Sequence, residues 1–212
     1  MKIQDVITYN QKITANITDK EIAKYFYDQD YGILLKFLRT GPKTIKEIEE
    51  AYRLVDNEKS DKTIYRYIKD LSEKGLVVEA GQRIFTDEEH RNKSVKIYMR
   101  TAKVFHDNSG AMKGESEVEK TKEKKAYYRA YKILLDLLEE DKDFTEECIE
   151  GIIDKIYLEG QKLATQLIEK SGDEVFQLLA EYDFTEVNEF IMNLAWIIMI
   201  YKKDFKNKLT TC

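Results

Sequence analysis

The residues best placed to do chemistry lie in the segment Ser60–Lys74. Within it, Ile64, Ile68 and Leu71 recur at i, i+4 and i+7, a spacing that puts them on one face of a helix. The opposite face then carries, in chain order, Lys62, Thr63, Arg66, Tyr67 and Lys69, with Tyr65 at the boundary. Cationic side chains on such a face can neutralise phosphates, and the Thr and Tyr hydroxyls can contact base edges or sugars.

A second group of basic residues follows this helix. Leu76–Ala80 and Val95–Met99 are rich in β-branched and aromatic residues, so we expect two strands and a wing at about 81–95. An arginine at a hairpin tip can enter the minor groove. The expected wing contacts with DNA are Arg83, Arg91 and Lys93. Three acids in the same tip would repel phosphate, namely Asp87, Glu88 and Glu89.

Two further helices must position the segment 60–74. The first is expected over about 31–39 and ends at Gly41-Pro42. Thr44 and Glu47 have the spacing of a capping box, which opens the second helix. Its inner face would consist of Ile45, Ile48, Ala51 and either Leu54 or Val55. After a turn at 56–59, Ser60 is a favourable N-cap for the basic helix.

The first twenty residues give a weaker pattern. Ile3, Val6 and Ile7 fit a short helix or an arm. Thr18 and Glu21 again have capping-box spacing, which predicts a helix to about Tyr27.

The second half of the chain reads as helical. Glycines at 110–114 indicate a joint, so we expect a domain at 1–109 and a helical domain at 110–212. Helices are expected at 115–140, 144–170, 173–182 and 184–205, with starts at Asp143-Phe-Thr-Glu146 and Asp183-Phe-Thr-Glu186. The last helix is apolar all round, so its own domain or a second subunit must cover it. Its aromatic neighbours would either pack or line a ligand pocket: Tyr127, Tyr131, Tyr157, Tyr182 and Trp196.

Charge and composition limit the function further. The chain carries a net charge of −5, yet Lys59–Lys103 holds 11 basic and 7 acidic residues, a local net of +4. A phosphate-binding protein needs such a local basic surface.

Two cysteines provide neither a disulfide framework nor metal-ligand spacing, which favours a cytoplasmic setting. The longest apolar run, 194–201, is far shorter than the ~20 residues of a membrane span. No catalytic or cofactor-binding motif is visible, and we expect no enzyme activity, cofactor or metal.

The segment Tyr31–Phe105 resembles winged helix-turn-helix regulators of the ArsR/MarR type, especially archaeal ArsR-like members. The stretches that carry the resemblance are ILLKFLRTGPKTIKEI, TIYRYIKDLSEKGLVVEAGQR and IYMRTAKVF. The resemblance implies that the family's recognition helix falls at about 60–74 and that a homodimer binds an operator. The Cys-x-Cys or Cys/His cluster of the metal-sensing members is missing, so metal sensing is not expected.

Together these patterns predict a mostly α protein, with an N-terminal winged helix-turn-helix and a C-terminal all-α domain. We expect a sequence-specific transcriptional regulator that binds double-stranded DNA as a homodimer through its C-terminal helices. The residues in the major groove would be Lys62, Thr63, Tyr65, Arg66 and Lys69. Two alternative functions stay open beside this expectation. A winged helix can serve as a protein-docking module without specific DNA binding, and the helical domain can hold a small-molecule effector.

Overall fold

The computed structural model describes residues 2–86, 91–107, 126, 128–134, 145–180 and 182–201. Over these residues the chain is mostly helical, with one three-stranded antiparallel sheet and one pair of parallel strands. It divides into two compact units. The first consists of Met1–Gly110 and Gly172–Phe184, and the second of Ala111–Ser171 and Thr185–Cys212. The joint expected at Gly110–Gly114 lies outside the described residues.

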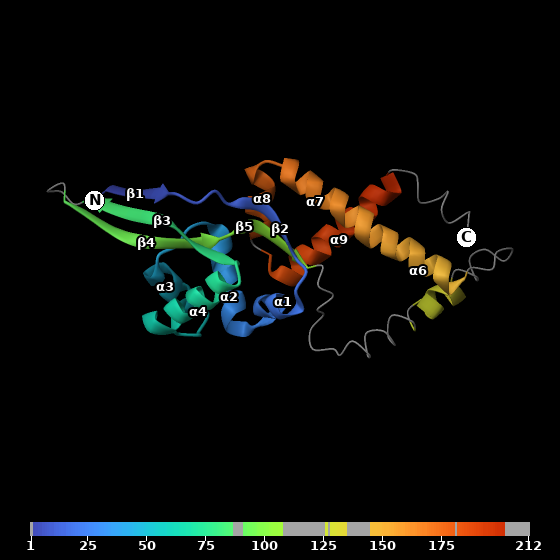
Figure 1. The fold of residues 1–212 in the computed structure, drawn as a ribbon, viewed down its shortest axis with the longest axis horizontal. Helices are drawn as coiled ribbons and strands as arrows, with labels where there is room; N and C mark the ends of the chain where they lie inside the picture. Colours follow the sequence, from blue (N-terminus) through green and yellow to red (C-terminus); the bar gives the residue numbers. More distant parts are fainter. Residues whose placement is uncertain are drawn as a thin grey trace. The chain divides into compact units, whose positions relative to one another are not determined.

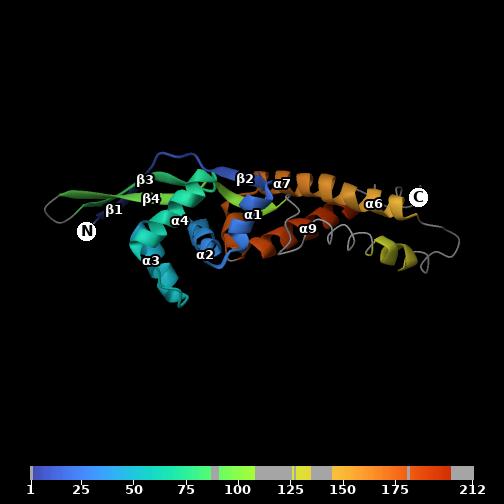
Figure 2. The same cartoon turned by 60° about the horizontal axis from the view of Figure 1, so that its bottom comes forward.

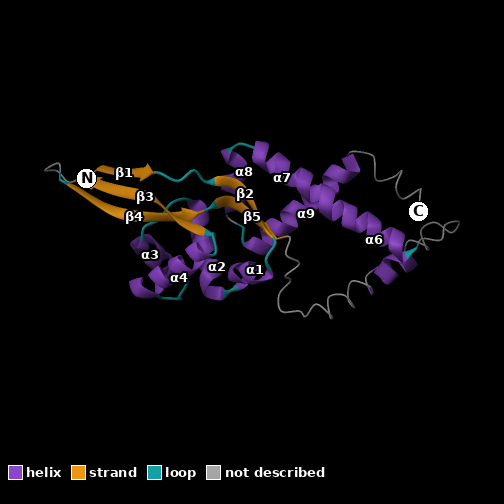
Figure 3. Ribbon diagram, in the orientation of Figure 1, coloured by secondary structure: helices purple, strands orange, loops and turns teal. Residues whose placement is uncertain are grey.

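Figure 1 shows the helices and strands of the first unit, and Figure 3 colours them by type. In chain order they are β1 (Lys2–Ile7), β2 (Lys12–Ile17), α1 (Lys20–Tyr27), α2 (Gln29–Phe37), the short 3-10 helix η1 (Leu38–Thr40), α3 (Ile45–Leu54), α4 (Asp61–Glu73), β3 (Val77–Thr86), β4 (Asn92–Arg100), β5 (Ala102–Asp107) and α8 (Asp173–Ala180). Helices α3 and α4 lie on one side of the β3–β4 hairpin, as Figures 1 and 2 both show.

The three-stranded sheet has the order β1–β3–β4, and all its pairs are antiparallel. Lys43 forms an isolated bridge with Tyr98 of β4, and β2 pairs with β5 in parallel. The hairpin strands are longer than expected, because pairing continues to Thr86 opposite Asn92. Residues expected to form a loose tip are therefore strand, and β1 supplies the second hydrogen-bonding partner for 81–86.

The expectation of a helix or arm for residues 1–17 is wrong, since two strands form there. Ile3, Val6 and Ile7 have helical spacing, but β1 takes its backbone hydrogen bonds from β3, about eighty residues later. A pairing partner so distant leaves no local periodicity to detect. The expected start at Thr18 is also displaced. Asp19 is the N-cap of α1, and its carboxylate accepts a hydrogen bond from Glu21 N at 2.8 Å.

The capping predictions for the next helices are confirmed. Thr44 and Glu47 form the complete capping box of α3, and Ser60 accepts from the backbone N–H of Thr63 at the start of α4. Helix α2 begins at Gln29, two residues before the expected start, because Asp28 caps it. These caps satisfy backbone donors that would otherwise lack partners in the first helical turn.

The core of the first unit lies between α2, α3, α4 and the base of the hairpin. Ile64, Ile68 and Leu71 of α4 are buried, as their spacing predicts. On α3, Ile48 and Ala51 are buried, again as expected. The assignment of Leu54 or Val55 to that inner face is wrong: the two are 85% and 54% exposed. Tyr52 is buried in their place, because its hydroxyl donates to the backbone oxygen of Asp30 at 2.6 Å.

The second unit is helical in its described parts. Its elements are α6 (Glu146–Lys155), the π-helical segment η2 (Ile156–Gly160), α7 (Gln161–Lys170) and, from Thr185 on, α9 (Phe184–Tyr201). The helices expected at 144–170, 173–182 and 184–205 are confirmed to within a few residues. Of the one expected at 115–140, only residues 126 and 128–134 are described, and these are helical. Thr145 caps α6 by accepting from Cys148 N at 3.2 Å, and Asp143 lies outside the described residues.

One detail of this unit differs from expectation. Cys148 is disulfide-bonded, although the sequence was expected to form no disulfide framework. The chain's other cysteine, Cys212, lies outside the described residues. On helix α9, Ile191, Ala195 and Ile198 are buried, whereas a second apolar set is exposed in the single chain, namely Ile197, Ile200 and Tyr201. Its own domain therefore covers only part of this apolar helix.

Candidate nucleic-acid interface

The exposed side of α4 carries most of the residues expected to meet DNA. Lys62, Arg66 and Lys69 are exposed, Tyr65 is 53% exposed, and Thr63 is half-buried beside the N-cap. Tyr67, which was expected on this side, is buried at 7% exposure. The basic surface of α4 is therefore made of three cations and one tyrosine, with Thr63 at its N-terminal edge.

The three cations of α4 form few contacts with carboxylates of the described residues. Lys62 makes no ion pair with any described residue. Lys69 lies 3.9 Å from Glu73, a loose contact between two exposed side chains that contributes little. Arg66 lies over the ring of Tyr67, 5.4 Å from its centroid. The ring holds the guanidinium in place, and it leaves the positive charge unneutralised.

Tyr67 points inward because it fixes α4 to α2. Its hydroxyl donates to the Asp30 carboxylate at 2.7 Å, and the Tyr31 hydroxyl donates to Asp70 of α4 at 2.6 Å. The rings of Tyr31 and Tyr67 pack with centroids 4.7 Å apart. These contacts set the rotation of α4 about its axis, and hence which residues it presents to solvent.

Asp30 also holds the turn before α4. The same carboxylate accepts from Asn57 Nδ2 at 2.9 Å and from Lys59 Nζ at 3.0 Å. Burial raises the pKa of Asp30, but the hydrogen bonds from Tyr67, Asn57 and Lys59 outweigh it and leave the pKa below its ordinary value. Sequence reasoning missed this group, because its donors come from 27 to 37 residues away and no local spacing links them.

Tyr65 sits where α4 meets the hairpin. Burial first, and then neighbouring Tyr65, whose side chain shares a hydrogen bond with Tyr98, raise the pKa of Tyr98 to about 12. Beside them Lys96 of β4 donates to Glu79 of β3 at 2.8 Å. Tyr65 therefore has one edge fixed against the sheet and the rest of its ring in solvent.

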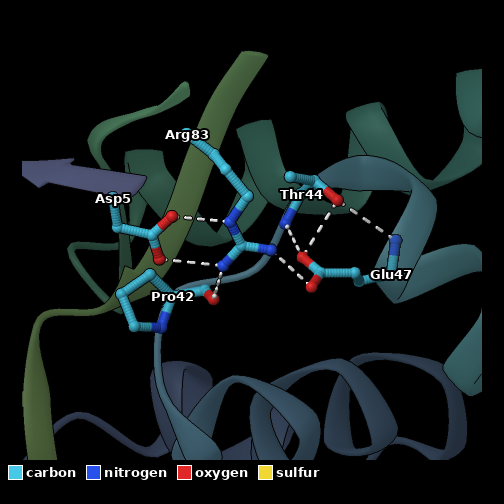
Figure 4. Close-up of polar contacts among 5 residues, drawn as sticks. All are labelled: Asp5, Pro42, Thr44, Glu47 and Arg83. Carbon is cyan, nitrogen blue, oxygen red and sulfur yellow. Dashed lines mark hydrogen bonds and ion pairs between the residues drawn. The ribbon is translucent and has the colours of Figure 1, made fainter. Parts of the chain in front are cut away.

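Arg83 lies inside an ion-pair cluster, as Figure 4 shows. Its Nε and Nη2 donate to the two carboxylate oxygens of Asp5 at 2.6 and 2.8 Å, and its Nη1 donates to Glu47. Glu47 is at the same time the capping-box residue that accepts from Thr44 N at 2.7 Å. Only 15% of the Arg83 side chain is exposed. The cluster joins β1, β3 and the start of α3, so Arg83 is engaged within the fold instead of being offered at a hairpin tip.

Arg83→Met is expected to lower the free energy of unfolding by about 1–2 kcal/mol, since a bidentate, half-buried ion pair is lost. The hydrogen bond from Arg83 lowers the pKa of Asp5. That contribution is present above the unfolded-state pKa of the carboxyl and disappears as the pH falls through its lower folded-state value. Urea unfolding at pH 7 and at pH 3 should therefore show a difference between wild type and variant that shrinks in acid. Lys96→Met removes an exposed pair on the same sheet and should cost much less; equal losses in the two variants would contradict the assignment.

The remaining expected wing contacts are Arg91 and Lys93, and both are exposed. They lie at the end of the hairpin where Thr86 pairs with Asn92, whereas α4 leads into the other end of β3 at Val77. The neighbouring positions 87–90, which include His90 and the three acids of the tip, lie outside the described residues. Arg91 and Lys93 thus form a second exposed basic region, separate from α4 in the chain.

A scan of known protein families matches none of them to this chain, and a search of curated proteins finds no match either. Within the described residues, no helix is long and apolar enough to cross a membrane. No group of three or more His, Cys, Asp or Glu side chains able to hold a metal ion occurs in the same part of the chain. Of the five aromatics considered for a pocket, Tyr131 and Tyr182 are exposed, and the side chains of Tyr127 and Tyr157 lie outside the described set.

Proposed function

We propose that this protein is a sequence-specific transcriptional regulator that binds double-stranded DNA as a homodimer. The observation that carries the proposal is the division of α4 into a buried apolar face and an exposed face with three cations. The order α2, α3, α4, β3, β4, with the bridge at Lys43, is also the order of elements in winged helix-turn-helix regulators. On this proposal α4 is the recognition helix and β3–β4 is the wing.

Each exposed residue then has a role that its chemistry can fill. Lys62, Arg66 and Lys69 would bind phosphates or the acceptor edges of guanine. Thr63 and Tyr65 would contact sugars or base edges. On the wing, Arg91 and Lys93 would bind the backbone or the minor groove. Arg83 is left out of the proposed contacts, because Asp5 and Glu47 already balance its charge.

Dimerisation would use the helical second unit. Ile197, Ile200 and Tyr201 are 62%, 63% and 85% exposed on α9, and neighbouring exposed apolar side chains of this kind often mark an interaction surface. A two-fold interface repeats the same surface on both subunits and would place two copies of α4 on successive half-sites. Effector binding remains a proposal for this unit without a described residue to carry it.

Arg66→Ala is expected to weaken DNA binding by on the order of tenfold and to lower the salt slope by about 1 if Arg66 meets a phosphate. Fluorescence anisotropy on a site selected from random DNA would measure both quantities. Arg129→Ala is the matched control, since it removes the same side chain from an exposed helical position of the second unit. An Arg66 variant that binds as tightly as this control would count against the recognition-helix assignment.

A protein-docking role is the second candidate, and one observation favours it. Leu54 and Val55 expose apolar surface at the end of α3, next to the turn that leads into α4. A partner protein bound there would be held mainly by apolar contact, which depends weakly on salt, whereas DNA binding falls steeply between low and physiological salt. Failure to enrich any DNA sequence from a random pool would shift the proposal to this role.

A further inference from the structure

Strand β1 lies at one edge of the three-stranded sheet, as Figure 1 shows. It pairs with β3 on one side, and no described residue forms a backbone hydrogen bond with its other side. In an antiparallel strand, alternate residues direct their N–H and C=O groups to opposite sides, so about half of these groups in β1 point away from β3. Such an edge can hydrogen-bond to a further extended strand.

The side chains of β1 make this edge apolar. Ile3, Val6 and Ile7 are 55%, 42% and 50% exposed. Between Ile3 and Ile7 the single charged residue is Asp5, and both of its carboxylate oxygens already accept from Arg83, at 2.6 and 2.8 Å. Free edges in native proteins usually carry unpaired charges or a proline that oppose further pairing. Residues 3–7 have neither of these protections.

The opposite edge of the sheet is protected. Lys43 exchanges two backbone hydrogen bonds with Tyr98 of β4, at 2.8 and 2.9 Å. Nearer the end of the hairpin, β4 carries Lys93 and Lys96, both exposed. Lysines on an edge strand oppose pairing, because a second strand would remove water from their charges. The sheet is therefore open to a further strand at β1.

The sequence of β1 is complementary to itself. A two-fold axis perpendicular to the sheet would place β1 antiparallel to β1 of a second copy, with side chains of the same face opposite each other. When the axis passes at Asp5, Ile3 lies opposite Ile7 of the second copy, and Gln4 lies opposite Val6 of the second copy. Each of these pairs occurs twice, because the axis exchanges the two chains.

Two contacts within the chain favour this register. Ile7 lies opposite Gly81 in β3, which has no side chain, so Ile3 of a second copy can cover Ile7. The two Asp5 carboxylates would face each other, but each already has Arg83 as its counter-ion. An axis one residue earlier would instead place Asp5 opposite Ile3, a charge against an apolar side chain, which costs desolvation without a compensating contact.

We propose that β1 is a self-association surface, through which two copies of the chain join their three-stranded sheets into one continuous sheet paired about Asp5. The surface uses neither α4, nor the end of the hairpin, nor α9. It therefore does not rest on DNA binding or on dimerisation through the second unit.

Sedimentation equilibrium of the full chain at increasing concentration tests the proposal. The measurements are made on Ile197→Lys as well as on wild type, because the substitution blocks association through α9. Association should persist in Ile197→Lys. Adding Ile3→Lys should weaken it on the order of tenfold, since one substitution enters a two-fold interface twice. Adding Ile13→Lys, at an exposed isoleucine of β2 in the same unit, should leave it unchanged. A monomeric Ile197→Lys variant, or equal association with Ile3→Lys and Ile13→Lys, overturns the proposal.

Two double substitutions test the register. Ile3→Lys combined with Ile7→Glu places opposite charges across both outer pairs and should restore association, whereas Ile3→Lys combined with Ile7→Lys places like charges there and should not. Both variants change the same two exposed positions, so they control for each other's effect on folding. Equal association of the two double variants overturns pairing about Asp5.

Discussion

Gly81→Ala is expected to destabilise the first unit by about 3 kcal/mol and to release β1 from the sheet. Gly81 lies at the β-bulge that follows Glu79, with φ +144°, a conformation that side-chain-bearing residues rarely adopt. A Cβ at this position would stand 2.0 Å from the carbonyl oxygen of Val6 in β1. That oxygen belongs to the backbone, so the collision can be relieved only by moving the strand.

A matched substitution separates the collision from the backbone strain. Gly75 also has a positive φ, +70°, but a Cβ there would meet nothing within 4 Å. Gly75→Ala should therefore cost only about 1 kcal/mol. Chemical unfolding measures both losses, and hydrogen exchange of the amides in β1 reports the release of the strand. Slow exchange in β1 of the Gly81 variant, or equal losses for the two substitutions, would show that the close approach to Val6 has no energetic consequence.

Much of the helical framework could be predicted from the sequence because its signals are local. The capping box at Thr44 and the N-cap at Ser60 each operate within one helical turn, and the structure contains both. The buried face of α4 follows from the spacing of Ile64, Ile68 and Leu71. The helices of the second half were found in the same way, by apolar periodicity between breaks at 171–172 and 181–183.

The failures at β1 and at Arg83 share one physical cause, which is dependence on partners remote in the sequence. Whether Ile3 and Val6 belong to a helix or a strand was decided by β3, about eighty positions away. Arg83 was expected to be a wing contact because the wing was placed at about 81–95. Pairing with β1 makes residues 81–86 part of a strand and brings Arg83 to Asp5. No pattern within one element contains that information.

Tyr67 shows the same limit at the candidate site. On a helical wheel Tyr67 falls with the polar residues of α4, but its side chain has an apolar ring and a polar hydroxyl. The spacing of residues along the helix is therefore compatible with either a buried or an exposed Tyr67. The hydroxyl is buried only because the Asp30 carboxylate is available to accept from it. The exposure of Lys62, Arg66 and Lys69 could be predicted, but the network that orients them could not.

Asp30→Asn is expected to lower the free energy of unfolding by about 3 kcal/mol at pH 7, because hydrogen bonds to a charged group contribute about 1.5–3 kcal/mol each. The substitution keeps the shape of the side chain and removes the charge that accepts from Tyr67, Asn57 and Lys59. If α4 is the recognition helix, the same change should weaken DNA binding although Asp30 does not lie on the exposed face. Urea unfolding and anisotropy measure the two effects on one preparation.

The stability that Asp30 contributes depends on pH. The pKa of Asp30 is lowered in the folded protein, so its stabilisation is fully present above the unfolded value of about 3.9 and is lost as the pH falls through the folded value. Wild type and Asp30→Asn should therefore differ most near neutrality and converge in acid. Tyr67→Phe should lose part of the same stability, whereas Tyr25→Phe, whose hydroxyl makes no hydrogen bond with a described residue, should lose little. A constant difference between wild type and Asp30→Asn from pH 7 to pH 3 would mean that the charge of Asp30 does not hold α4 in place.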